Sequence, residues 1–479
     1  MNYVFFLTLL LGWQSVPAQD AKSVVEASRF IKLGNTLRMV DRPQQAIDLL
    51  LRALPAVQLK DFYLTAVAYE NLGYAYNEQE NSQDAVRYFQ KALYLYQKLN
   101  FAASEAAMRQ LIAETSGKDV YAGIDIGSSG VKLAIFRTTY ENGFYAKDIK
   151  SKPLAPNVTL ISGTAQSFQA GQDVMRAYMD SIRHYNVPAD RIYIAFSSGI
   201  NETLGKTPDK KKKLYEQFSA LIASSLPQSQ GLTIDTTLTP AREAELFMIG
   251  AMPRKFWSTT SCIDIGSGNT KGGYYDPNPS RTDYTFRPIS FPYGTKTLAN
   301  LIDDKRSLPI DAYKEEALRV IRAIADTAVN VEFNMANPGL QQRKTVGLGG
   351  GIAWAMATYL HPERAAITAV PLTAGDVERF RQLAMTDYQT LIHPDLTNLT
   401  DPVVRRKAET DVNNVQAQFN EKQIIAGALL METVFRAYAN TSVSKRFVFI
   451  RDSDISWVTG KFLESLNRNY ERAIAGGAR

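Results

Sequence analysis

The pattern of apolar and polar positions in the first quarter of the chain predicts helices that pack in pairs. Between Ala27 and Ala113 apolar positions recur at the spacing of an α-helix, with few residues that interrupt one. In one pair, the small residues Gly73 and Ala85 let two helices approach closely while large apolar residues fill the space between them. A second pair with the same internal offsets precedes it. The positions of the two units are Phe30, Leu33, Gly34, Leu37, Ala46, Leu50, Ala53 and Tyr69, Leu72, Gly73, Tyr76, Ala85, Phe89, Ala92.

The offsets within both units resemble those of tetratricopeptide repeats. Tyr69 follows Phe30 by 39 residues, more than the usual repeat of about 34, which implies a longer connection around residues 56–63. Such repeats stack into a concave surface that binds a peptide or another protein, so the resemblance implies a protein partner. The alternative is a helical pack that only stabilises its neighbour. Because two repeats are fewer than the usual three, we expect a third helical pair or the next domain to cap the stack.

Beyond about residue 119 the pattern changes to short apolar segments that run into glycine-rich turns. Residues 121–136 predict a strand, a tight turn and a strand, and residues 262–275 repeat this design. In residues 346–353 an apolar strand runs into a glycine turn and a helix. These three windows hold 11 of the 29 glycines, so an ordinary glycine content is unevenly distributed. Backbone N–H groups in such turns can approach phosphate oxygens closely.

Each of the two hairpins carries an aspartate at the end of its first strand and a lysine seven residues later. The pairs are Asp125 with Lys132 and Asp264 with Lys271. The aspartates are placed to hold a divalent cation or its waters, and the lysines can add positive charge beside an anion. Together with the two lysines, the predicted phosphate-binding residues are Gly127, Ser128, Ser129, Gly130, Gly266, Ser267, Gly268, Asn269, Thr270, Gly349 and Gly350.

The duplicated strand–aspartate–glycine hairpin resembles the actin, sugar-kinase and heat-shock-chaperone superfamily. Within it, residues 119–470 are most similar to the exopolyphosphatase and guanosine-pentaphosphate phosphohydrolase family. Three further stretches carry this resemblance, at residues 240–247, 290–295 and 421–431. The resemblance implies an α/β fold class, with two ribonuclease-H-like (actin-like) lobes around a cleft that holds a phosphorylated ligand. An all-α tetratricopeptide repeat module would precede the lobes.

The same resemblance implies a phosphohydrolase that uses magnesium. Glu243 matches the second Glu of the family's Glu pair and would orient or deprotonate the water that attacks a terminal phosphorus. Asp125 and Asp264 would hold Mg²⁺. Polyphosphate or a phosphorylated nucleotide would be the substrate, cradled by the two hairpins.

The chain also departs from the family's pattern. Lys271 stands where the second hairpin usually ends in Glu, Arg242 replaces the first Glu of the pair, and residues 196–202 contain no Arg. With these departures, three functions remain open. The first is the phosphohydrolase. The second is a non-catalytic phosphate or nucleotide sensor whose repeats recruit a protein partner, and the third is an ATPase or kinase of the wider superfamily.

Composition narrows the classes of protein and ligand. The chain has 479 residues with 45% apolar and 21% charged residues, which excludes disorder and coiled coil as its main state. One cysteine, Cys262, excludes an intramolecular disulfide and should be a small buried thiol, and three histidines argue against a zinc site. A net charge of +6 suits an anionic ligand without requiring one. The basic run at residues 210–213 lacks interleaved aromatic residues, so no nucleic-acid partner is expected.

The start of the chain predicts a targeting segment. Residues 4–13 form a largely apolar run that is too short to span a bilayer as a helix. Small residues lead up to Ala18, so we predict a signal peptide at residues 1–18 and export to the periplasm or the outside of the cell, with no stable membrane insertion after cleavage. No Lys or Arg precedes the run, which leaves a retained anchor or a docked helix as alternatives. The remaining predicted domains are helical repeats at 19–118, a first lobe at 119–242 and a second lobe with C-terminal helices at 243–479.

Overall fold

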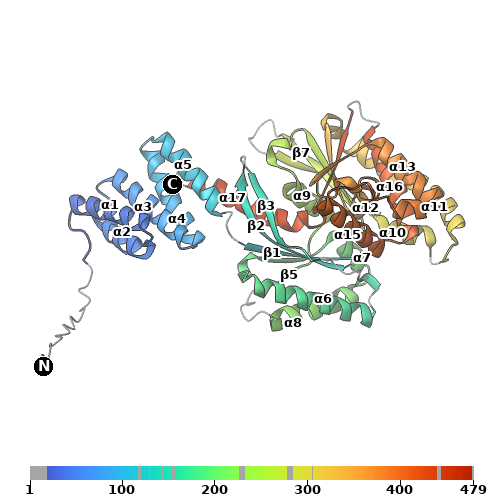
Figure 1. The fold of residues 1–479 in the computed structure, drawn as a ribbon, viewed down its shortest axis with the longest axis horizontal. Helices are drawn as coiled ribbons and strands as arrows, with labels where there is room; N and C mark the ends of the chain where they lie inside the picture. The colour runs from blue at the N-terminus through green and yellow to red at the C-terminus, as the bar shows by residue number, and fades with distance from the viewer. Residues whose placement is uncertain are drawn as a thin grey trace, which may run out of the picture. The chain divides into compact units, whose positions relative to one another are not determined.

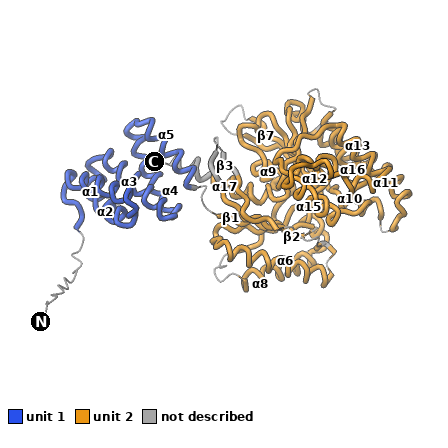
Figure 2. Tube along the Cα trace, viewed as in Figure 1, with its two compact units in different colours: residues 1–119, 467–479 blue, residues 120–466 orange. Residues whose placement is uncertain are grey.

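The computed structural model of the chain describes residues 19–116, 120–128, 130–141, 144–153, 158, 160–162, 164–225, 232–277, 284–304, 306–439 and 444–476. The chain divides into two compact units, Met1–Asp119 with Asn467–Arg479 and Val120–Leu466 (Figures 1 and 2). The predicted signal peptide at residues 1–18 lies outside the described residues. Across the described ranges, no helix combines the length and apolar character needed to cross a membrane.

The first unit is built from antiparallel helices. Its described helices are α1 Val24–Met39, α2 Pro43–Val57, α3 Phe62–Glu78, α4 Ser82–Lys98 and α5 Ala102–Ser116, together with the end of α17 Ser456–Gly476. The side chains of Ser23, Asp61 and Asn81 accept backbone N–H groups at the starts of α1, α3 and α4, so polar residues between the helices fix where each begins.

Small residues decide how the helices of each pair approach. A Cβ atom on Gly73 of α3 would lie 2.4 Å from the ring of Phe89 on α4, and one on Gly34 of α1 would lie 2.8 Å from Leu50 on α2. The two predicted helical pairs are therefore present, and their steric basis is as expected. Met108 and Ile112 of α5 join the same apolar core, so this helix extends the stack beyond the second pair.

The second unit begins with a five-stranded sheet. It contains strands β1 Val120–Gly127, β2 Gly130–Glu141, β3 Phe144–Ser151, β4 Ile192–Phe196 and β5 Ile234–Asp235. The strand order is β3-β2-β1-β4-β5, in which β1 and β2 are the antiparallel hairpin and β4 and β5 run parallel to β1. One face is covered by α6 Ala165–His184 and α8 Pro208–Ser225, while α7 Ser198–Gly205 follows the end of β4 (Figure 1).

A second sheet repeats this topology. Its strands are β6 Thr260–Ile265, β7 Thr270–Pro277, β8 Tyr284–Phe291, β9 Thr345–Gly349, β10 Ala369–Leu372 and β11 Arg446–Ile450. Within the order β10-β11-β9-β6-β7-β8, strands β8-β7-β6-β9-β11 match the first sheet, and β10 is an addition at the edge. The helices that cover it are α10 Thr295–Asp303, α11 Ile310–Ile324, α12 Gly351–Leu360, α13 Ala374–Thr386, α14 Tyr388–Ile392, α15 Pro402–Gln418 and α16 Glu421–Ala439.

Two helices share the core between the sheets. The helices α9 Pro240–Ala251 and α17 Ser456–Gly476 place Phe247 and Val458 in one apolar cluster with Phe136 of the first sheet and Cys262 of the second. Cys262 is fully buried, as predicted, and burial raises the pKa of its thiol. The structure thus confirms the predicted α/β class, with two sheets of repeated topology after an all-α repeat module.

Candidate functional site

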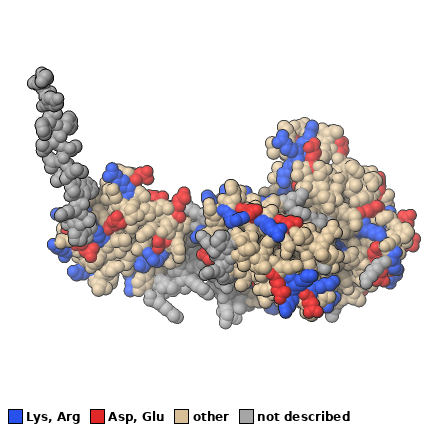
Figure 3. Space-filling model, turned by 90° about the horizontal axis from the view of Figure 1, so that it is seen from below, with Lys and Arg blue, Asp and Glu red and all other residues tan. Residues whose placement is uncertain are grey.

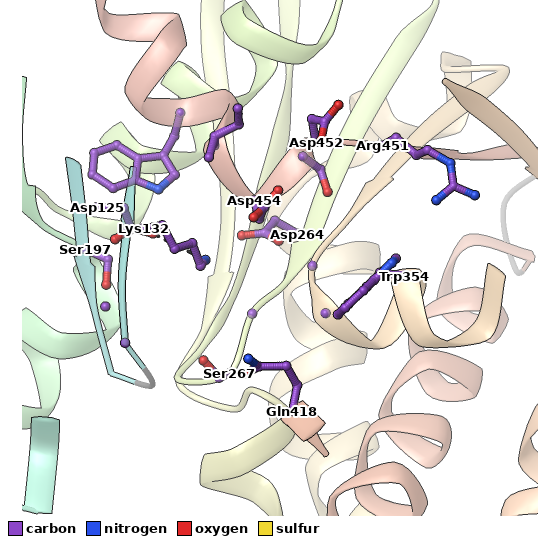
Figure 4. Close-up of a pocket in the computed structure, with 18 of the residues that line it drawn as sticks. Asp125, Lys132, Ser197, Asp264, Ser267, Trp354, Gln418, Arg451, Asp452 and Asp454 are labelled. Carbon is purple, nitrogen blue, oxygen red and sulfur yellow. Dashed lines mark hydrogen bonds and ion pairs between the residues drawn. The ribbon is translucent and has the colours of Figure 1, made fainter. Parts of the chain in front are cut away.

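A cavity of about 610 Å³ lies where the turns of the two hairpins come together in Val120–Leu466. Figure 4 shows Asp125 and Lys132 of the first hairpin on one side and Asp264 and Ser267 of the second on the other. The fold therefore brings together the two hairpins that the sequence predicts, although they lie more than a hundred residues apart in the chain. The predicted site residues that line the cavity are Asp125, Gly127, Ser128, Gly130, Lys132, Glu243, Asp264, Gly266, Ser267, Gly268, Asn269, Lys271 and Gly350.

Three predicted site residues are not part of this lining. Thr270 and Gly349 lie behind it, and Ser129 is not among the described residues. Thr270 is fully buried and donates its hydroxyl to the backbone carbonyl of Tyr293 at 2.7 Å. Gly349 lies behind the second hairpin, because a Cβ atom on it would be 3.2 Å from Oδ1 of Asp264. Ser129 lies outside the described residues.

The two hairpin turns also touch each other. A Cβ atom on Gly268 would lie 3.1 Å from Oγ of Ser128 and 3.2 Å from Cα of Gly199, so a larger residue would fit here only if its neighbours shifted slightly. Asn269 donates its side-chain amide to Oγ of Ser198 at 3.1 Å and to a carboxylate oxygen of Glu202 at 2.9 Å. The turn of the second sheet is therefore attached to the start of α7 below the first sheet.

The spacing of seven residues between aspartate and lysine has a simple structural meaning. Asp125 is the cross-strand neighbour of Lys132, and Asp264 is the cross-strand neighbour of Lys271. Each lysine consequently reaches back to its own aspartate, with N–O distances of 3.4 Å in the first hairpin and 2.9 Å in the second.

The Lys271 ammonium is enclosed by acidic and amide oxygens. Besides Asp264, it contacts Oε1 of Glu243 at 3.0 Å and Oδ1 of Asn269 at 3.3 Å, and the residue is only 4% exposed. Burial opposes the charge of this ammonium, but Asp264 and Glu243 outweigh burial and raise the pKa of Lys271. Lys271 is therefore a permanent positive charge inside the site.

The Glu243 carboxylate is held at both oxygens. Oε1 faces Lys271, and Oε2 accepts the backbone N–H of Ser198 at 2.6 Å, at the start of α7. Thr239 caps α9 and so fixes Glu243 in the first turn of that helix, where it is 2% exposed. A general base accepts a proton from the attacking water, and here the ammonium and the amide compete with that water for the two oxygens.

The Asp125 carboxylate differs from that of Glu243, because only one of its two oxygens has a contact among the described residues. Its Oδ2 contacts Lys132, while its Oδ1 is buried and has no hydrogen-bond partner among the described residues. Burial raises the pKa of Asp125 to about 6, and Lys132 opposes this effect while the charge of Glu243 adds to it.

We expect the Asp125 carboxyl to make the stability of the second unit fall as pH rises. The folded pKa, about 6, lies above the ordinary value of 3.8, so the stabilising protonated form is present below pH 4 and is lost through pH 6. Asp125→Asn should therefore gain up to about 3 kcal/mol over the parent between pH 4 and pH 8. Urea unfolding at both pH values measures this, and a parent-to-variant difference that does not change with pH would contradict it.

The rim of the cavity carries charged residues that the sequence did not single out. Lys152 pairs with Asp452 at 2.7 Å and with Asp454 at 2.6 Å, which joins the first sheet to the start of α17. Arg451 and Lys296 also line the cavity, and burial, assisted by Lys132, lowers the pKa of Lys296 to about 8. Lys152 and Lys296 stand alone in the sequence, and Arg451, Asp452 and Asp454 follow directly after β11 without a glycine turn, so none of them belongs to a motif that indicates an anion site.

The face drawn in Figure 3 does not show a separate basic track among its described residues. On the face of Val120–Leu466 shown in Figure 3, Lys and Arg side chains are interspersed with Asp and Glu. The basic run at residues 210–213 lies at the start of α8, and Lys211 donates to the backbone carbonyl of Thr236 at 3.2 Å. The cavity is therefore the better candidate for an anionic ligand.

The residues present do not fit the magnesium ion that the resemblance implies. Each of the two predicted metal ligands already pairs with a lysine: Oδ2 of Asp125 lies 3.4 Å from the Lys132 ammonium, and Oδ2 of Asp264 lies 2.9 Å from the Lys271 ammonium. A dication about 4 Å from either ammonium would be repelled by roughly 8 kcal/mol at an effective dielectric constant of 20. Among the described residues, no group of three or more His, Cys, Asp or Glu could hold a metal.

Comparisons with known proteins identify the repeats of the first unit and structures similar to the chain. The tetratricopeptide repeat family model matches residues 25–98. No curated protein matches the chain. Among solved structures, the chain is similar to the Aquifex aeolicus member of the Ppx/GppA protein family, at 16% identity and a TM-score of 0.47 over 73% of this chain and 98% of that one.

Two further solved structures show the same level of similarity. An exopolyphosphatase-like protein is 13% identical with a TM-score of 0.49, over 73% of this chain and 99% of that one. An exopolyphosphatase from Cytophaga hutchinsonii is 16% identical with a TM-score of 0.45, over 72% of this chain and 98% of that one. The chain thus consists of tetratricopeptide repeats at residues 25–98 and a two-sheet α/β unit similar to structures of the Ppx/GppA family.

Proposed function

We propose that this protein binds the phosphate chain of polyphosphate or of a phosphorylated nucleotide in the cavity between its two hairpins, without cleaving it. The repeats would bind a protein partner, since repeats of this kind bind proteins, and the partner would respond to whether the phosphate chain is bound. The observation that carries the proposal is the locked Glu243 carboxylate, which contacts Lys271 and Ser198 at its two oxygens. The resemblance makes Glu243 the water-activating residue, and here the Lys271 ammonium and the Ser198 amide compete with water for its oxygens.

The remaining features support binding of phosphate. The backbone of both glycine turns lines the cavity, and a turn without bulky side chains lets amide groups reach phosphate oxygens. Lys132 and Lys296 line the same cavity and can provide charge-assisted hydrogen bonds for an anion. Arg451 also lines it, but its guanidinium donates to the carboxylate of Asp411 and to the backbone carbonyls of Ile367 and Arg364. A ligand with several phosphates could contact groups from both sheets.

A second candidate function is the phosphohydrolase itself. The observation that favours it is Asp125, which lines the cavity and keeps Oδ1 without a partner among the described residues. Because this oxygen is buried, it could accept a proton only from a water molecule that reaches it from the cavity. Hydrolysis would then depend on Asp125 and not on Glu243.

One set of measurements separates the two functions. Calorimetric titration with inorganic tripolyphosphate should show binding, and Lys132→Met should weaken it by about tenfold, the loss expected for a contact of roughly 1.4 kcal/mol to a charged group. Release of phosphate from polyphosphate, ATP and guanosine pentaphosphate should not exceed that of the Glu243→Gln variant. Phosphate release that Asp125→Asn abolishes would establish the hydrolase. If the protein binds neither tripolyphosphate nor the two nucleotides and releases no phosphate from any of the three substrates, both functions are refuted.

A further inference from the structure

The most unusual feature of the cavity is that a lysine occupies the centre of its acidic cluster. The Lys271 ammonium lies within 3.3 Å of oxygens from Asp264, Glu243 and Asn269. It also lies directly behind the glycine turn, since a Cβ atom on Gly266 would be 3.4 Å from Nζ. The Lys271 ammonium is therefore next to the backbone of the glycine turn that would bind a phosphate.

The equivalent lysine of the first hairpin shows that this arrangement is not a general property of the topology. Lys132 holds the same register position but contacts one carboxylate oxygen, at 3.4 Å, and its side chain is 34% exposed. Lys271 contacts two carboxylates and its side chain is 5% exposed. The two hairpins therefore offer the same residue in two different environments within one protein.

We infer that the Lys271 ammonium is a built-in cation that takes the place of a divalent metal ion in this site. Its single charge offsets one of the two negative charges of Asp264 and Glu243, and it does so from a position behind the second glycine turn. This inference rests on the proposed binding of a phosphate chain, and it adds that such binding needs no divalent metal. The ammonium contacts Oδ2 of Asp264 and Oε1 of Glu243, so a metal ion would have to displace it in order to bind these two oxygens.

The first test compares tripolyphosphate binding to the full-length parent protein in EDTA and in MgCl₂. We expect binding in EDTA to be at least as tight as in MgCl₂, because magnesium can only compete by binding the ligand. A loss of about tenfold or more in EDTA would overturn the inference. Absence of binding in both buffers would instead refute the proposed function, so the two failures are distinguishable.

The second test asks directly whether the position holds a cation, with Mn²⁺ as the probe and electron paramagnetic resonance as the readout. The parent should leave Mn²⁺ free in solution, and Lys271→Gln should bind Mn²⁺ and melt at a higher temperature in its presence. Lys132→Gln is the matched control and should gain no binding, since it frees a single carboxylate. Mn²⁺ binding to the parent, or a folded Lys271→Gln protein that ignores Mn²⁺, would overturn the inference. If Lys271→Gln does not fold, the two measurements on the parent decide.

Discussion

Lys271→Met is expected to destabilise the unit Val120–Leu466 by roughly 3–5 kcal/mol, the cost of leaving buried charges without a partner. The change keeps the length and apolar stem of the side chain but removes the ammonium. The carboxylates of Glu243 and Asp264, whose side chains are 2% and 13% exposed, would then repel each other without compensation. Urea unfolding followed by tryptophan fluorescence measures the loss, because Trp257, Trp354 and Trp457 lie in this unit.

Two comparisons make this result specific to the buried cluster. Lys132→Met removes the equivalent lysine, yet it should cost less than about 1 kcal/mol because that pair is longer and partly exposed. The double variant Lys271→Met/Glu243→Gln should be more stable than Lys271→Met alone, since one of the unpaired charges is gone. Equal losses for Lys271→Met and Lys132→Met would show that the enclosure of Lys271 has no energetic consequence.

The second large effect is expected where α9 crosses α17. A Cβ atom on Gly250 would lie 1.9 Å from the backbone oxygen of Ser456, and one on Gly460 would lie 2.0 Å from the backbone oxygen of Leu246. Because the obstacles are backbone atoms of helices, no side-chain rotation relieves the clash. Gly250→Ala should therefore cost more than the roughly 1–3 kcal/mol typical of overpacking and should reduce the yield of folded protein.

Gly250→Ala should also weaken tripolyphosphate binding, because α9 carries Glu243 into its contacts with Ser198 and Lys271. The matched control is Gly205→Ala at the end of α7, where an added Cβ atom meets nothing within 4 Å. That variant should be neutral, or stabilising by up to about 1 kcal/mol through helix propensity. Thermal unfolding of both proteins measures the difference, and similar melting temperatures would contradict the steric argument.

The local elements were predictable because their signals are local. Apolar spacing and small residues such as Gly73 and Ala85 predicted the helical pairs, which the structure contains as α1–α2 and α3–α4. Both hairpins and the strand-to-helix turn at Gly350 were also predictable, because glycine turns between apolar strands permit few conformations. The spacing of seven residues placed Asp264 and Lys271 in one hairpin, although their register became visible only in the sheet.

The sequence by itself determined the two kinds of architecture, the duplicated hairpins and the gathering of Asp125, Asp264 and Glu243 around one site. It did not determine what those residues do there. From the sequence, Lys271 is interpreted as one more positive charge near a phosphate. In the structure it lies between Glu243 and Asp264, and the side chains of all three residues are largely buried. Which groups neutralise one another depends on contacts between segments that are distant in the chain, and on exclusion of water that strengthens those contacts. Contacts between distant segments and the exclusion of water both arise only in the tertiary structure. The tertiary structure therefore decided that a lysine is the cation of this site.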